Sequence, residues 1–119
     1  MFLAGLFGAA GVAAAAAASH GAAGPNLGVA AQFLMIHAGI IAAIGLSNLA
    51  PRRVYLIAGS GLALGVALFS GDLTLRATLG HALFAMAAPL GGTLLIVGWL
   101  ALCASGLFTF VKPHFNSAP

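Results

Sequence analysis

The 119-residue chain is 62% hydrophobic and 4% charged, with four basic residues and one acidic residue. Because soluble domains carry about 25% charged residues, this composition excludes a water-soluble globular domain. The net charge of +3 is too sparse for a nucleic-acid surface, and a single cysteine excludes an internal disulfide. We therefore expect one domain that is embedded in a lipid bilayer and binds no nucleic acid.

Four apolar segments follow one another at residues 2–19, 27–49, 54–79 and 81–111, with a polar tail at 112–119. Crossing the hydrocarbon core takes about 20 apolar residues per helix, a length that each segment approaches or exceeds. The first segment is mostly alanine and glycine, so it inserts weakly alone and should pack against its neighbours. It lacks the basic start of a signal peptide, so we interpret it as a membrane helix. The sequence predicts an all-α, integral membrane four-helix bundle.

The fourth segment contains a proline and two glycines, at Pro89, Gly91 and Gly92. Proline removes a backbone donor and clashes with the preceding turn, so we expect this helix to be kinked there. Trp99 lies 13 residues before Lys112, about 20 Å along a helix, which predicts a position deep in the membrane.

The basic residues predict the orientation of the helices. Arg52, Arg53 and Lys112 fall on one side of the membrane with both termini, whereas Arg76 falls on the other side. Cytoplasmic loops carry the excess of lysine and arginine. We therefore expect both termini in the cytoplasm.

The only acidic residue, Asp72, lies 18 positions after Val54, about 27 Å along a helix and near the outer edge of the hydrocarbon. Arg76 follows one turn later, and this i,i+4 spacing places both side chains on one helix face. One interpretation is a neutralised helix end. The other is a working carboxylate in a polar pocket.

Three histidines fall on the same side of the membrane as this pair: His20 and His81 at span ends, and His37 within the second span. Together with Asp72 and Arg76 they form a candidate polar ligand site that opens outward. Alternatively, His20 and His81 lie at headgroup level at helix ends, and His37 only forms a hydrogen bond between helices.

No catalytic centre can be assembled from this sequence. A carboxylate pair is impossible with one acid, and the glycines lack the lysine of a phosphate-binding loop. Haem held by paired histidines, or a quinone near His37, is conceivable, but the histidines differ in depth and a metal needs matched ligands. We predict no enzyme activity, no metal and no cofactor.

Small residues recur at spacings that suit close helix packing. Gly61 and Gly65 are four apart on the third span, and Gly91, Gly92 and Trp99 are the corresponding candidates on the fourth. These positions either pack within one bundle or contact a second protein.

Four stretches together resemble one family: ASHG, FLMIHAGIIAAIGL, ALGVALFSGDL and APLGGTLLIVGWLAL. In this order they are similar to the YgdD-like family of small, uncharacterised inner-membrane proteins. The resemblance implies a four-helix protein of the bacterial inner membrane with no established activity. The first loop is shorter than the family's, and Asp72 stands where serine is common, so the ionisable cluster is partly particular to this chain. The positions that match the family pattern are His20, His37, Ser70, Gly71, Pro89, Gly91, Gly92, Gly98 and Trp99.

Two functional hypotheses follow. The first is a non-catalytic accessory subunit that packs against other membrane protein subunits, such as those of a respiratory or other energy-converting complex. The second is a small transporter or a lipid- or quinone-binding protein that uses the polar cluster around His37 and Asp72.

Overall fold

Four α-helices follow one another in the computed structural model, which describes residues 1–21, 24–49 and 51–115, with side chains among them as far as Val111. They are α1 (Phe2–Ser19), α2 (Pro25–Leu46), α3 (Arg52–Thr78) and α4 (Ala87–Phe115). All four are long and apolar enough to cross a membrane, and no strand occurs in the described ranges. The expectation of an all-helical protein with four membrane-capable helices is therefore confirmed.

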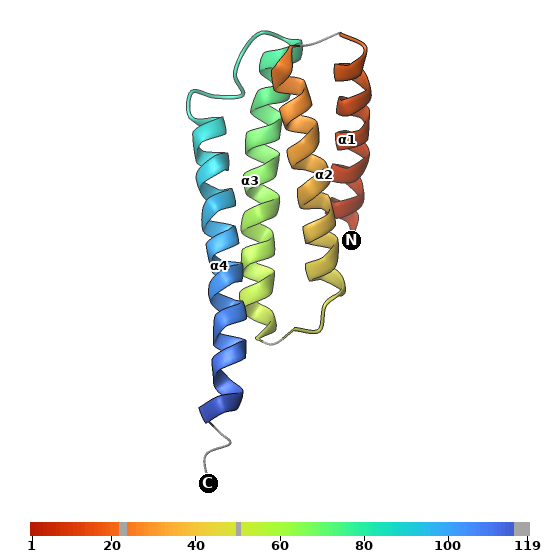
Figure 1. The fold of residues 1–119 in the computed structure, drawn as a ribbon. Coiled ribbons are helices and arrows are strands. Elements are labelled where there is room, and N and C mark those ends of the chain that lie inside the picture. The colour runs from red at the N-terminus through yellow and green to blue at the C-terminus, as the bar shows by residue number, and fades with distance from the viewer. Residues whose placement is uncertain (22–23, 50, 116–119) are drawn as a thin grey trace.

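The helices stand side by side in chain order (Figure 1). The main interfaces join α1 to α2, α2 to α3, and α3 to α4, so α1 and α4 form the two edges of the row. Short connections force each helix to run antiparallel to the one before it. As a result, only α2 and α3 have neighbours on both sides.

The core lies where α2, α3 and α4 meet. Leu62 and Val66 on α3 are completely buried, and Leu34 of α2 and Leu95 of α4 pack with them. The edge helix α1 buries only Ala4 and Gly11 among its 18 residues. Large apolar side chains cover the outside of the row, for example Ile57 (73% exposed), as expected of a surface solvated by lipid.

Two glycines in the left-handed conformation terminate helices. Gly21 follows the end of α1 with φ of 71°, and Gly80 follows the end of α3 with φ of 73°. A side chain disfavours this conformation, which is why glycine commonly stands just beyond a helix. Both positions lie at the same end of the row.

The prolines set where three helices begin. Pro25 is the first residue of α2, and Pro51 directly precedes α3. We expected α4 to begin near His81 and to bend at Pro89, but it begins at Ala87. Pro89 therefore lies in the first turn, where its missing N–H has no intrahelical partner to lose. The proline is accommodated without a break in the middle of the helix.

The C-terminal end of α4 continues to Phe115, so the first half of the expected polar tail is helical; residues 116–119 lie outside the described residues. The N-terminal end of α1 and the C-terminal end of α4 point toward the end of the row where α2 connects to α3 (Figure 1). The described ends of the chain therefore lie at the same end of the row, and the cytoplasmic location of that end stays a prediction.

Candidate functional site

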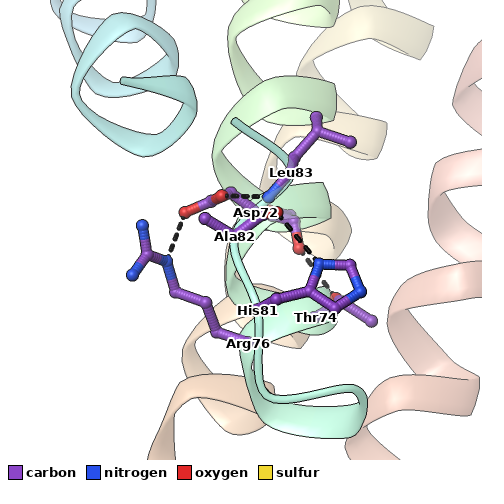
Figure 2. Close-up of polar contacts among 7 residues, drawn as sticks. Asp72, Thr74, Arg76, His81, Ala82 and Leu83 are labelled. Atoms are coloured by element: carbon purple, nitrogen blue, oxygen red, sulfur yellow. Dashed lines mark hydrogen bonds and ion pairs between the residues drawn. The ribbon is translucent and has the colours of Figure 1, made fainter. Parts of the chain in front are cut away.

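Asp72 is fully buried near the C-terminal end of α3. Its Oδ1 accepts a hydrogen bond from the backbone N–H of Leu83 at 2.7 Å, and its Oδ2 accepts one from Nε of Arg76 at 2.7 Å. Leu83 belongs to the connection between α3 and α4, which passes over the helix end to reach the carboxylate (Figure 2). Hydrogen bonds to a charged acceptor are about twice as strong as neutral ones. Asp72 therefore fastens this connection to α3.

Arg76 forms the i,i+4 ion pair with Asp72, but its side chain is 43% exposed. Only Nε takes part, and the two terminal nitrogens point away from Asp72 (Figure 2). In the part of the chain that the structure describes, these two nitrogens donate to no side chain or carbonyl. The pair is thus asymmetric, with a buried anion and a cation that reaches the surface.

His37 is buried on α2 and is held in one tautomer by two partners. Its Nδ1 lies 2.8 Å from the Phe33 carbonyl oxygen, which can only accept, so Nδ1 carries the proton. Its Nε2 lies 3.3 Å from Nε1 of Trp99 on α4, which can only donate. Both ring nitrogens of His37 are therefore already engaged, Nδ1 with the Phe33 carbonyl and Nε2 with the Trp99 indole.

Aromatic rings surround this hydrogen bond. Phe33 stacks on the His37 ring with centroids 5.8 Å apart, and Phe69 of α3 contacts Phe33 at 4.7 Å. The His37 and Trp99 rings meet edge to face. A line of four rings thus connects three helices, and aromatic contacts of this kind add to the stability gained by burial alone.

A groove of about 460 Å³ opens beside these rings. Phe33 and His37 contribute one wall, Phe69 another, and α4 supplies the third from Gly92 to Leu100. The volume is in the range of small-ligand sites, about 300–1,000 Å³. Its lining is almost entirely apolar, because the imidazole and indole nitrogens bond to each other. Such a surface suits hydrocarbon.

Gly65 of α3 and Gly91 of α4 bring the two backbones together. A Cβ on Gly91 would lie 2.8 Å from the Gly65 carbonyl oxygen and 2.5 Å from the Phe69 nitrogen. A Cβ on Gly65 would lie 3.0 Å from the Gly91 oxygen. The two contacts at Gly91 are too short for any side chain, and the contact at Gly65 is tighter than most Cβ contacts, so glycines allow the two helices to cross closely here.

The other candidate packing positions behave differently. A Cβ on Gly61 meets nothing within 4 Å, and one on Gly92 makes only an ordinary contact, 3.9 Å from Phe69. Gly98, which spacing did not single out, is a close contact, since its Cβ would lie 2.7 Å from Leu62. Trp99, grouped with the packing residues, is 42% exposed and bonds to His37 instead.

The five candidate site residues fall into separate groups. Asp72 and Arg76 are paired, and exposed His81 lies nearby in the connection, where its Nδ1 donates to the Ala82 carbonyl at 3.0 Å (Figure 2). His37 faces the groove, and exposed His20 caps the end of α1. No hydrogen bond or ion pair between described residues joins the histidines to Asp72 or Arg76.

The chemistry open to these groups follows from their partners. An iron or a quinone at His37 would have to displace the Trp99 indole, because Nδ1 is committed to the Phe33 carbonyl. Among the described residues, no three His, Cys, Asp or Glu side chains are placed to share a metal ion. The Oγ of Ser70 is buried without a protein partner in the described part of the chain.

Comparisons with known proteins agree with this architecture. Residues 4–92 match the model of a family described as "Protein of unknown function (DUF423)". A "UPF0382 membrane protein" of Haemophilus influenzae is 31% identical over 71 residues, which is 60% of this chain and 57% of that protein. This chain thus spans less than two thirds of that relative. No solved structure matches. The resemblance to a family of small, uncharacterised membrane proteins is confirmed.

Proposed function

The chain belongs to the DUF423 family, and we propose that it acts as a non-catalytic accessory subunit that packs laterally against another membrane protein. We place it in the bacterial inner membrane with both termini cytoplasmic. Arg52 and Arg53 at the start of α3 support this orientation, because the cation at the opposite end, Arg76, is paired with Asp72.

The observation that carries this proposal is how little of the chain lies between the helices. Among the described residues the longest connection is that between α3 and α4, at 79–86. Connections of this size provide no surface for a soluble partner of standard interface area. The surface available for recognition is therefore the side of the helices, within the membrane.

The outer face of α1 is the part of that surface best suited to another protein. Gly5, Ala9 and Ala13 recur at four-residue spacing and are all exposed. Alanine and glycine gain little from contact with lipid, whereas small residues at this spacing allow two helices to approach closely. A partner helix against α1 would bury a face that α2 leaves uncovered.

Substitutions that place larger side chains on this face of α1 test the proposal. We expect the wild-type protein, extracted in a mild detergent, to migrate on a native gel within an assembly much larger than one chain. The double variant Ala9→Leu/Ala13→Leu should shift to the position of the isolated protein, because leucine prevents close approach. Mass spectrometry of the wild-type assembly identifies the partner, for which the sequence favours a respiratory or other energy-converting complex.

The matched control is Ala104→Leu, which makes the same change at an exposed position on α4. It should leave the assembly intact. Wild-type protein that migrates only as a single chain, or an assembly that is unaffected by the α1 double variant, would contradict the proposal.

A further inference from the structure

A cation, Arg76, lies on the same helix as one wall of the groove beside His37 and Trp99. Phe69 lines the groove, and Arg76 follows it by seven residues on the same helix. Seven residues return a helical side chain to within about 20° of the same direction, and they advance it by about 10 Å. Arg76 therefore points to the same side of α3 as Phe69, two turns nearer the end of the helix.

The exposed part of Arg76 is the part that recognises anions. Its Nε is bound to Asp72, and its terminal nitrogens point outward (Figure 2). The bonds that Asp72 accepts come from Nε of Arg76 and from the Leu83 N–H, and none between described residues comes from these terminal nitrogens. A guanidinium in this state can still bind a phosphate oxygen, which arginine favours for its planar array of donors.

An apolar groove with a cation beyond one end suits a molecule that has an apolar chain and a negatively charged headgroup. We propose that the groove holds one acyl chain of an anionic phospholipid, whose phosphate is bound by Arg76. The charge complementarity at Arg76 selects an anionic headgroup, and the apolar walls select hydrocarbon. This inference does not depend on the accessory role, since a lipid can occupy the groove whether or not a protein covers α1.

The groove offers less to a quinone. A quinone ring would require a hydrogen-bond donor, but the Trp99 N–H is taken by His37 and the Nδ1 proton of His37 by Phe33. A saturated chain requires no donor. The bond between His37 and Trp99 thus favours a lipid tail over a quinone headgroup.

Trp99 is the only tryptophan of the chain and lines the groove, so its fluorescence reports directly on the occupant. The full chain is reconstituted in phosphatidylcholine vesicles that contain increasing fractions of a lipid with brominated acyl chains, either phosphatidylglycerol or phosphatidylcholine. We expect brominated phosphatidylglycerol to reach half-maximal quenching at a mole fraction about two- to fivefold lower than brominated phosphatidylcholine does. This is the preference for an anionic lipid that one basic side chain near a membrane surface provides.

Two variants separate the headgroup from the chain. Arg76→Gln should remove the preference for phosphatidylglycerol, whereas Arg76→Lys should retain most of it. Gly92→Leu places a side chain in the groove with no close contact at its Cβ, and should reduce quenching by both lipids. The control Gly61→Leu adds the same side chain at an open position outside the groove and should change nothing.

Equal quenching of the wild-type protein by the two brominated lipids would overturn the proposal. So would a preference that survives in Arg76→Gln, because the anion would then be bound elsewhere. Stronger quenching by a ubiquinone than by brominated phosphatidylglycerol, with no effect of Arg76→Gln, would assign the groove to a quinone instead.

Discussion

Replacing Asp72 with alanine is expected to lower the Tm of the purified protein in detergent by about 8 °C, as loss of a charged hydrogen bond in a chain of this size implies. The change removes the acceptor for the Leu83 N–H and releases the connection between α3 and α4. Arg76 loses its partner at the same time. Circular dichroism at 222 nm, recorded during heating, measures the effect.

Two further variants identify which contact is responsible. Arg76→Gln should lower the Tm by no more than about 3 °C, because solvent screens the 43% exposed guanidinium and Asp72 keeps its bond from the Leu83 N–H. Asp72→Asn retains an oxygen for Leu83 and should fall between the two. If Arg76→Gln were as damaging as Asp72→Ala, the ion pair rather than the backbone contact would hold the connection, and our interpretation of Asp72 would be wrong.

Replacing Gly91 with alanine is expected to cost about 3 kcal/mol, the upper end of the usual cost of overpacking. A methyl group there would lie 2.5 Å from the Phe69 nitrogen and 2.8 Å from the Gly65 oxygen, both backbone atoms that cannot rotate away. The helices α3 and α4 must therefore separate. Steric trapping in bicelles, which measures unfolding within a bilayer-like phase, gives the free energy directly.

Gly61→Ala is the matched control for this substitution. Both changes replace a glycine within a helix. The higher helix propensity of alanine alone would stabilise each variant by about 1 kcal/mol. The Cβ at position 61 meets no atom within 4 Å, so this variant should be as stable as the wild type or more so. Equal stability of Gly91→Ala and Gly61→Ala would show that α3 and α4 do not cross closely at Gly91.

The membrane helices were predictable because composition alone determines them. Long apolar stretches interrupted by polar, glycine- or proline-containing turns predict helices that can cross a membrane. The structure has four helices of this kind among the described residues. The start of α4 was not predictable from apolarity, since residues 81–86 are nearly as apolar as the helix that follows. The hydrogen bond from Leu83 to Asp72 takes this segment out of the helix, and no local pattern reveals it.

The pairing of Asp72 with Arg76 follows from helical spacing, but the contacts of His37 do not. Whether His37 meets Trp99 depends on how α2 and α4 are rotated on either side of α3, and the sequence gives no value for these rotations. The two residues are 62 positions apart. Both match the family pattern, which was the one signal that they belong together.

The same limit applies to the glycines. Gly61 and Gly65 satisfy one motif equally well, yet only Gly65 lies at the crossing with α4. Residues four apart on a helix differ by about 40° in direction, and two crossing helices are close only over a short length. A spacing motif therefore marks a helix face, whereas the point of closest approach depends on the partner helix.

The most direct measurement of the membrane topology is labelling of single cysteines at the two ends of α3. In a Cys103→Ser background, His81→Cys and Asn48→Cys each place one thiol in an exposed connection. A membrane-impermeant maleimide should label His81→Cys in intact cells, and Asn48→Cys only after the membrane is made permeable. Labelling of both in intact cells would contradict the crossing of the bilayer by α3, and the reversed pattern would contradict cytoplasmic termini.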